Sequence, residues 1–101
     1  MLCQFTISPL GYGESLSSEV SKIIDLIDKS GLPYQTHSMG TIVEGSWEEV
    51  MALIQKCHNT MLARNARVST TIHIDDRKNS NHRIKGKITS IENHLGRTIS
   101  K

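Results

Sequence analysis

Apolar residues recur in this sequence with two different periods, and the order of those periods limits what the chain can fold into. Alternation of apolar and polar residues predicts strands, because successive side chains of a strand point to opposite faces. This pattern predicts four strands, at residues 2–8, 34–39, 41–44 and 67–75. The helical period of 3.6 residues predicts helices at 15–30 and directly after Ser46, and a last helix from Ile84 to Leu95.

The same periods predict which side chains face the core. On the strands these are Cys3, Phe5, Ile7, Val68, Thr70, Ile72 and Ile74. On the helices they are Leu16, Val20, Ile23, Ile24, Ile27, Val50, Leu53, Ile54, Cys57, Met61 and Leu62. The alternate strand positions leave a polar face, which consists of Gln4, Thr6, Ser8, Ser69, Thr71, His73 and Asp75. One apolar and one polar face indicate an antiparallel sheet covered by helices on one side.

Local signals mark where these elements begin and end. Gly31 follows the first helix, where a residue of left-handed conformation commonly stops a helix. Gly40 predicts a tight hairpin between the two middle strands. Ser46 and Glu49 match a capping box, in which each side chain bonds to the backbone N–H of the other residue.

The predicted order is β-α-β-β-α-β followed by a helix, in one domain over residues 1–101. This is the ferredoxin-like order, an α+β fold with an antiparallel sheet of strand order 4-1-3-2. In this topology Ser8, the hairpin Met39-Gly40-Thr41 and the start of the fourth strand lie at one end of the sheet. Glu44 and Asp75 lie at the other end.

The composition argues against nucleic acids and membranes as binding partners. Twelve basic and ten acidic residues give a net charge of +2, and there are only four aromatic residues, so neither charge nor stacking side chains indicate nucleic-acid binding. No segment has the length and hydropathy of a membrane span or the pattern of a secretion signal. Cys3 and Cys57 are predicted to be buried, unreactive thiols. We therefore expect a cytoplasmic protein.

The segment from Ser8 to Ser15, SPLGYGES, connects a strand to a helix. Ser15 is the predicted N-cap of that helix, and the free N–H groups of a helix start can bind an anion or an acceptor. The segment has neither the lysine of a Walker loop nor the three glycines of a dinucleotide fingerprint. It is either a tight turn or one wall of a ligand site beside the hairpin.

The polar face allows three interpretations. It is solvated, covered by another subunit, or part of a pocket for a small polar heterocycle, since hydroxyl groups both donate and accept hydrogen bonds. His73 and Asp75 lie on one side of their strand, so an enzyme using them as base and orienting group is the alternative function. We expect no metal site and no cofactor, because three convergent ligands cannot be identified.

Four segments together resemble the thiamine-binding protein family. They are ISPLGYGESLSSEV at 7–20, YQTHSMGTIVE at 34–44, TTIHIDDR at 70–77 and KITSIENHL at 87–95. The resemblance implies a ferredoxin-like fold, homodimers assembled into homotetramers, and non-catalytic binding of thiamine or its hydroxymethylpyrimidine moiety. It draws attention to Ser8, Gly11, Ser15, Met39, Gly40, Thr41, Glu44 and Asp75 as ligand-binding candidates. A carboxylate, Glu44 or Asp75, is expected near the thiazolium charge.

Overall fold

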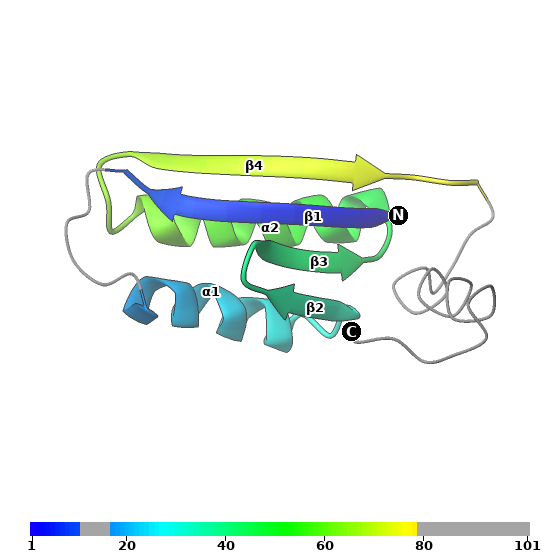
Figure 1. The fold of residues 1–101 in the computed structure, drawn as a ribbon, viewed down its shortest axis with the longest axis horizontal. Coiled ribbons are helices and arrows are strands. Elements are labelled where there is room, and N and C mark those ends of the chain that lie inside the picture. The colour runs from blue at the N-terminus through cyan, green and yellow to red at the C-terminus, as the bar shows by residue number, and fades with distance from the viewer. Residues whose placement is uncertain (11–16, 79–101) are drawn as a thin grey trace.

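The computed structural model describes residues 1–10 and 17–78 and confirms the predicted order of elements (Figure 1). The strands are β1 (Leu2–Pro9), β2 (Tyr34–His37), β3 (Gly40–Glu44) and β4 (Val68–Asp75). The helices are α1 (Ser17–Lys29) and α2 (Trp47–Leu62). The predicted last helix, over 84–95, lies outside the described residues. In the described part of the chain, no helix is long and apolar enough to cross a membrane.

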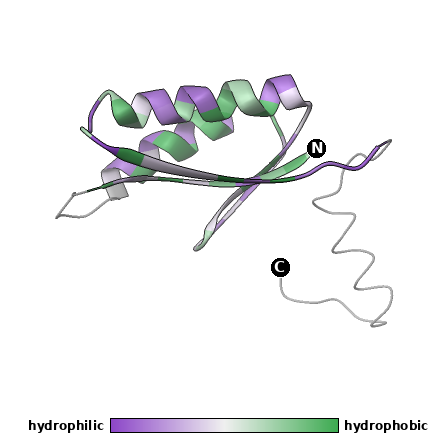
Figure 2. Ribbon diagram, turned by 90° about the horizontal axis from the view of Figure 1, so that it is seen from above, coloured by the Kyte–Doolittle hydropathy of each residue, from purple (hydrophilic) through white to green (hydrophobic). Residues whose placement is uncertain are grey.

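The four strands form one antiparallel sheet of order β2-β3-β1-β4, as the sequence predicts. Both helices pack on the same face of this sheet, and within residues 1–10 and 17–78 no element covers the other face, here called the open face (Figure 2). Strand β1 pairs with β4 over its whole length, from Leu2 opposite Asp75 to Pro9 opposite Val68. Its pairing with β3 runs only from Leu2 opposite Glu44 to Phe5 opposite Thr41. The hairpin of β2 and β3 therefore ends beside the middle of β1.

The core lies between the sheet and the two helices. Its fully buried side chains come from β1, α1, β3 and α2, and they are Cys3, Ile27, Val43, Val50, Cys57 and Met61. Burial raises the pKa of both thiols, that of Cys57 to about 11. These two cysteines are thus buried free thiols, as predicted.

The start of each helix is fixed by polar contacts. Ser46 caps α2, because its hydroxyl accepts from the Glu49 N–H at 3.1 Å while the Glu49 carboxylate accepts from the Ser46 N–H at 3.0 Å. In α1 the buried carboxylate of Glu19 accepts from Arg64 Nε at 3.2 Å, and Arg64 follows α2. This contact ties the first turn of α1 to the end of α2.

Three details of the prediction are wrong. The hairpin does not turn at Gly40: Ser38 and Met39 form the turn, and Gly40 is the first residue of β3, paired with His37. Val20 and Leu62 are 43% and 44% exposed, because each lies at the rim of its helix stripe rather than at its centre. Ile72 is 38% exposed although it pairs with buried Phe5, because β4 is an edge strand.

Candidate functional site

A pocket opens where β1 continues beyond the end of the hairpin. From Thr6 onward, no described strand pairs with β1 on the side that faces β3. The resulting space, here called the hairpin pocket, has a volume of about 230 Å³. Its lining comes from three places: Phe5–Ser8 of β1, Thr36–Thr41 of the hairpin, and Val20, Ile23 and Ile24 of α1.

The pocket combines apolar walls with hydroxyl groups. The hydroxyls of Thr36 and Thr41 lie 3.1 Å apart and form a hydrogen bond to each other, in which either one can donate. Thr41 is 5% exposed and forms the inner part of the polar wall, whereas Thr36 is exposed and forms its outer part. At the turn, the Met39 N–H donates to His37 Nδ1 at 3.4 Å, which leaves Nε2 of the ring outside that contact. Such a mixture of apolar surface and a few polar groups is typical of small-molecule sites.

Gly40 allows the hairpin to lie against β1. Its φ is +151°, in the region that favours glycine. A Cβ at this position would stand 3.0 Å from Thr6 Cγ2 and 3.2 Å from the Phe5 carbonyl oxygen. Any side chain here would push the hairpin away from β1 and change the shape of the pocket.

The structure brings together half of the predicted site residues. Ser8, Met39, Gly40 and Thr41 all line the hairpin pocket. Gly11 and Ser15 lie outside the described residues, so their place in the site stays a prediction. Residues on both sides of their segment, Ser8 and Val20, do line the pocket.

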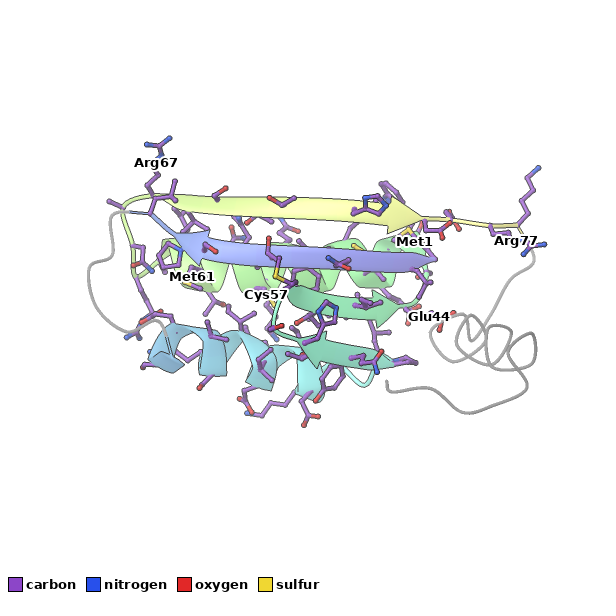
Figure 3. The ribbon with its side chains drawn as sticks, in the orientation of Figure 1. Met1, Glu44, Cys57, Met61, Arg67 and Arg77 are labelled. Atoms are coloured by element: carbon purple, nitrogen blue, oxygen red, sulfur yellow. The ribbon has the colours of Figure 1, made fainter. Side chains whose placement is uncertain are left out.

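Glu44 and Asp75 lie elsewhere. Both pair with Leu2, one on each side of β1, at the end of the sheet where Met1 lies (Figures 1 and 3). Leu2 is three residues from Phe5, which is about 10 Å along a strand. No carboxylate lines the hairpin pocket among the described residues. The two acids therefore do not join the other predicted site residues within one chain.

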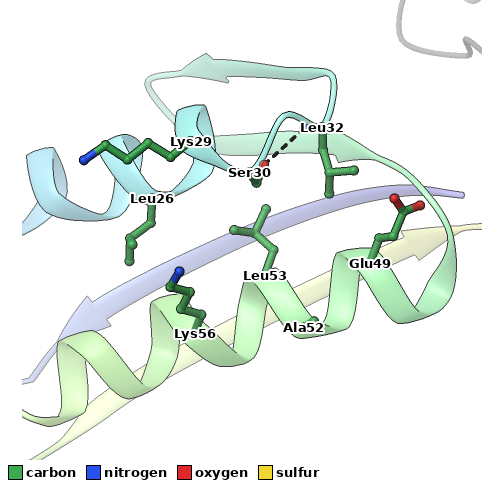
Figure 4. A pocket seen from close by; sticks show the side chains of 8 residues that line it. All are labelled: Leu26, Lys29, Ser30, Leu32, Glu49, Ala52, Leu53 and Lys56. Carbon is green, nitrogen blue, oxygen red and sulfur yellow. Dashed lines mark hydrogen bonds between the residues drawn. The ribbon is translucent and has the colours of Figure 1, made fainter.

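A second cavity of about 310 Å³ lies between the helices (Figure 4). Leu26, Leu32 and Leu53 form its apolar surface, and Lys29, Lys56 and Glu49 form part of its rim. Two of these charges are already paired: Lys29 Nζ lies 2.8 Å from Asp25, and Glu49 belongs to the capping box. None of the predicted ligand-binding residues lines this interhelical cavity, so the hairpin pocket is the better candidate.

The alternative site at His73 gains no support from its surroundings. His73 is exposed on the open face opposite Gln4, and Asp75 is two residues further along β4. Neither residue lines the hairpin pocket or the interhelical cavity. Over residues 1–10 and 17–78, no three His, Cys, Asp or Glu side chains come together in a way that could hold a metal ion.

Several lining residues were not among the predicted site residues. Thr36 was missed because it looks like any polar residue of a short edge strand, although its position opposite Thr41 follows once the hairpin register is known. The pattern predicts Val20 and Ile24 as core residues, since periodicity identifies the apolar side of a helix but not the part of it that borders a pocket. His37 also lines the pocket.

The sheet order and the helices on one face define a ferredoxin-like α+β protein, and known proteins share this fold. The crystal structure of hypothetical protein MJ1052 from Methanocaldococcus jannaschii has a TM-score of 0.82 at 34% identity, covering 89% of this chain and 93% of that one. A proposed thiamine biosynthesis/salvage protein from Thermotoga maritima, TM0486, has a TM-score of 0.78 and covers 89% and 96%. At 20% identity, this second likeness shows the fold alone.

Sequence similarity extends over nearly the whole chain. UPF0045 protein Mb1933 of Mycobacterium bovis is 38% identical over 96 residues, which are 94% of each chain. The family model described as thiamine-binding protein matches residues 3–92. The chain therefore belongs to the thiamine-binding protein family, as its motifs indicate.

Proposed function

We propose that this protein is a non-catalytic binding protein that takes up the hydroxymethylpyrimidine moiety of thiamine, or thiamine itself, in the hairpin pocket. The main support is the convergence of Ser8, Met39, Gly40 and Thr41, selected from the family motifs, on one pocket. Membership of the thiamine-binding protein family supports the choice of ligand. No proton transfer is required for binding, and the hairpin pocket has no acidic side chain in the described part of the chain.

The size and lining of the pocket suit one substituted ring. Sites for drug-sized ligands occupy about 300–1,000 Å³, and the hairpin pocket is smaller, at about 230 Å³. An aminopyrimidine carries donors and acceptors on one edge, and the Thr36 and Thr41 hydroxyls can match either kind. Phe5 and Ile23 provide apolar surface for the ring faces, and the Met39 thioether can pack against the ring edge.

The thiazolium ring of thiamine gains no counter-charge in this pocket. Glu44 and Asp75, expected to stabilise that charge, lie about three strand residues away along the sheet. Because no described carboxylate lines the pocket, the affinities of hydroxymethylpyrimidine and thiamine should differ by less than about tenfold, which corresponds to about 1.4 kcal/mol.

Calorimetric titration with both compounds tests this proposal. Thr41→Val keeps the side-chain shape but removes one hydroxyl, and should weaken binding about 2- to 10-fold, the effect of one neutral hydrogen bond. Thr70→Val is the matched control, because the Thr70 hydroxyl is also hydrogen-bonded, to His58 at 2.6 Å, but outside the pocket. Absence of heat at millimolar ligand with folded protein, or equal loss of affinity in both variants, would refute the proposal.

Self-association and location form the remaining part of the proposal. The open sheet face, and the homotetramers that the family resemblance implies, support self-association of this chain. Sedimentation of the full chain tests it most directly. A cytoplasmic location is supported by the two buried free thiols, because proteins of oxidising compartments usually pair their cysteines.

A further inference from the structure

The connection between α2 and β4, residues 63–67, contacts the chain on both sides of the segment that joins β1 to α1. At its start, Arg64 Nε donates to the Glu19 carboxylate of α1 at 3.2 Å. At its end, the Arg67 carbonyl oxygen accepts from the Leu10 N–H at 2.9 Å. Leu10 directly follows β1, and Glu19 lies in the first turn of α1. One short connection thus holds both the end of β1 and the start of α1.

The connection is itself fixed to the core. The Met61 carbonyl oxygen accepts from the Arg64 N–H at 3.1 Å and from Asn65 Nδ2 at 2.9 Å. Met61 is 1% exposed, and a side chain packed at core density cannot shift without displacing its neighbours. The backbone of Arg64 therefore has a fixed position, from which its side chain reaches α1.

Helix α1 depends on this anchor, because its main packing partner is α2 rather than a strand. Ile23 and Ile27 provide its buried apolar contacts, and apolar contacts are not directional. The hydrogen bond to Glu19 is directional, and it is costly to lose because the carboxylate is buried. At the far end of α1, Asp28 accepts from the Tyr34 hydroxyl of β2 at 2.9 Å, at an exposed site. The first two turns of α1 are therefore placed mainly by their contact with the connection.

The same two turns form one wall of the hairpin pocket, through Val20, Ile23 and Ile24. The other walls belong to β1 and the hairpin, so the width of the pocket depends on where α1 begins. We propose that Arg64 is a positioning residue for this pocket, which holds the α1 wall at its distance from the hairpin through the Glu19 carboxylate. Neither Arg64 nor Glu19 lines the pocket, so the effect on binding passes through α1 and rests on the ligand site proposed above.

Removal of the Arg64 donor leaves Glu19 without its closest partner. Lys22 Nζ lies 3.8 Å from the same carboxylate oxygen, but Lys22 belongs to α1 itself and cannot hold α1 to α2. A buried carboxylate that loses its partner is strongly destabilised, and it regains hydration only when the first turn of α1 moves outward. That movement would carry Val20 away from the hairpin and widen the pocket.

Calorimetric titration with hydroxymethylpyrimidine tests this role with two variants at the same position. Arg64→Met removes the donor and should weaken binding about 2- to 30-fold, the range for residues that act on a site through their neighbours. Arg64→Gln removes the charge but keeps a donor nitrogen as many bonds from the backbone as the arginine Nε, and should keep most of the affinity. Ser46→Ala is the control, because it destabilises the far end of α2 and should bind like the wild type.

Amide spectra of the ligand-free protein test the same role without a ligand. Arg64→Met should shift the signals of residues 20–24 and, because α1 moves relative to the hairpin, also those of residues 36–41. Arg64→Gln and Ser46→Ala should leave the signals of residues 36–41 in place.

The outcomes separate this role from the proposed function. Folded wild-type protein that does not bind hydroxymethylpyrimidine refutes the ligand site, whereas the signals of residues 36–41 still decide the positioning role. Arg64→Met that binds like the wild type, or that leaves those signals in place, overturns the role of Arg64. Equal losses of affinity in Arg64→Met and Arg64→Gln, or in Arg64→Met and Ser46→Ala, would also overturn it.

Discussion

Replacing Gly40 by alanine tests whether the hairpin lies as close to β1 as the structure places it. The new methyl group would stand 3.0 Å from Thr6 Cγ2 and 3.2 Å from the Phe5 carbonyl oxygen. The Thr6 side chain can adjust, but the carbonyl oxygen belongs to the central strand and cannot move without bending it. In addition, φ at this position is +151°, which alanine adopts only with strain.

The size of the effect can be worked out by comparison with Gly31. Gly31 also has a positive φ, +78°, but a Cβ there meets no atom within 4 Å. Gly31→Ala should therefore lower the free energy of unfolding by only the backbone strain, about 1–2 kcal/mol. Gly40→Ala adds the cost of overpacking, about 1–3 kcal/mol. We expect the Gly40 variant to lose more stability than the Gly31 variant by at least that second amount, because alanine is strained more at φ of +151° than at φ of +78°.

Urea unfolding followed by circular dichroism measures this difference. Both variants should fold, since a domain of this size is stable by about 5–15 kcal/mol, and both should keep the wild-type slope with a lower midpoint. Thr6→Ser removes the 3.0 Å contact and should recover part of the loss in Gly40→Ala but none in Gly31→Ala. Equal losses at the two glycines would refute the close approach of the hairpin to β1.

Four further perturbations, at the capping box, at Glu49, at the Arg64 contact and at the two thiols, have defined outcomes. Ser46→Ala should lower the free energy of unfolding by about 1 kcal/mol. The Ser46 backbone N–H lowers the pKa of Glu49, so the stability from that contact is present above the ordinary glutamate pKa and is lost as pH falls through the lowered one. Glu49→Gln should therefore lose less stability than the wild type between pH 6 and 3 in urea unfolding, and an equal loss would contradict the assignment. Arg64→Met should lower the free energy of unfolding by about 1–2 kcal/mol, because it removes a hydrogen bond to the buried Glu19. Lys29→Met removes an exposed ion pair with Asp25 and should lower it by less than about 0.5 kcal/mol. Thermal unfolding measures both losses. Cys3 and Cys57 should not react with a thiol reagent at pH 8 until denaturant is added, since burial raises both pKa values; rapid reaction of Cys57 in the native protein would contradict its place in the core.

The fold was predictable because each element carries its own periodic signal. Cys3 and Phe5 alternate with polar residues, and Val50, Leu53, Ile54 and Cys57 repeat at helical spacing, so type and order of the elements follow from local patterns. The antiparallel order β2-β3-β1-β4 then follows from the few topologies open to such a chain. The exposure of single apolar residues does not follow from the pattern. Leu62 lies at the rim of its helix stripe and Ile72 lies on an edge strand, and a single period shows neither position.

The site was predictable only in part. The predicted topology places Met39, Gly40 and Thr41 at the same end of the sheet as Ser8, and all four residues line one pocket. Their role in ligand binding stays a prediction. Motifs also named Glu44 and Asp75, although the same topology puts them at the opposite end of the sheet beside Leu2. A motif groups residues that a family keeps, and it does not distinguish a pocket from a strand end. The contribution of α1 to the pocket, through Val20 and Ile24, depends on packing angles that the sequence does not encode locally.

The most direct test of the central claim is a nuclear magnetic resonance titration of the full chain with hydroxymethylpyrimidine. Our account predicts that amide signals shift at residues 6–8, 20–24 and 36–41, and that those of Leu2, Glu44 and Asp75 stay in place. Signals around the interhelical cavity, such as those of Leu53 and Lys56, should also remain unchanged. Shifts concentrated in the interhelical cavity, or no shifts at millimolar ligand, would contradict binding in the hairpin pocket.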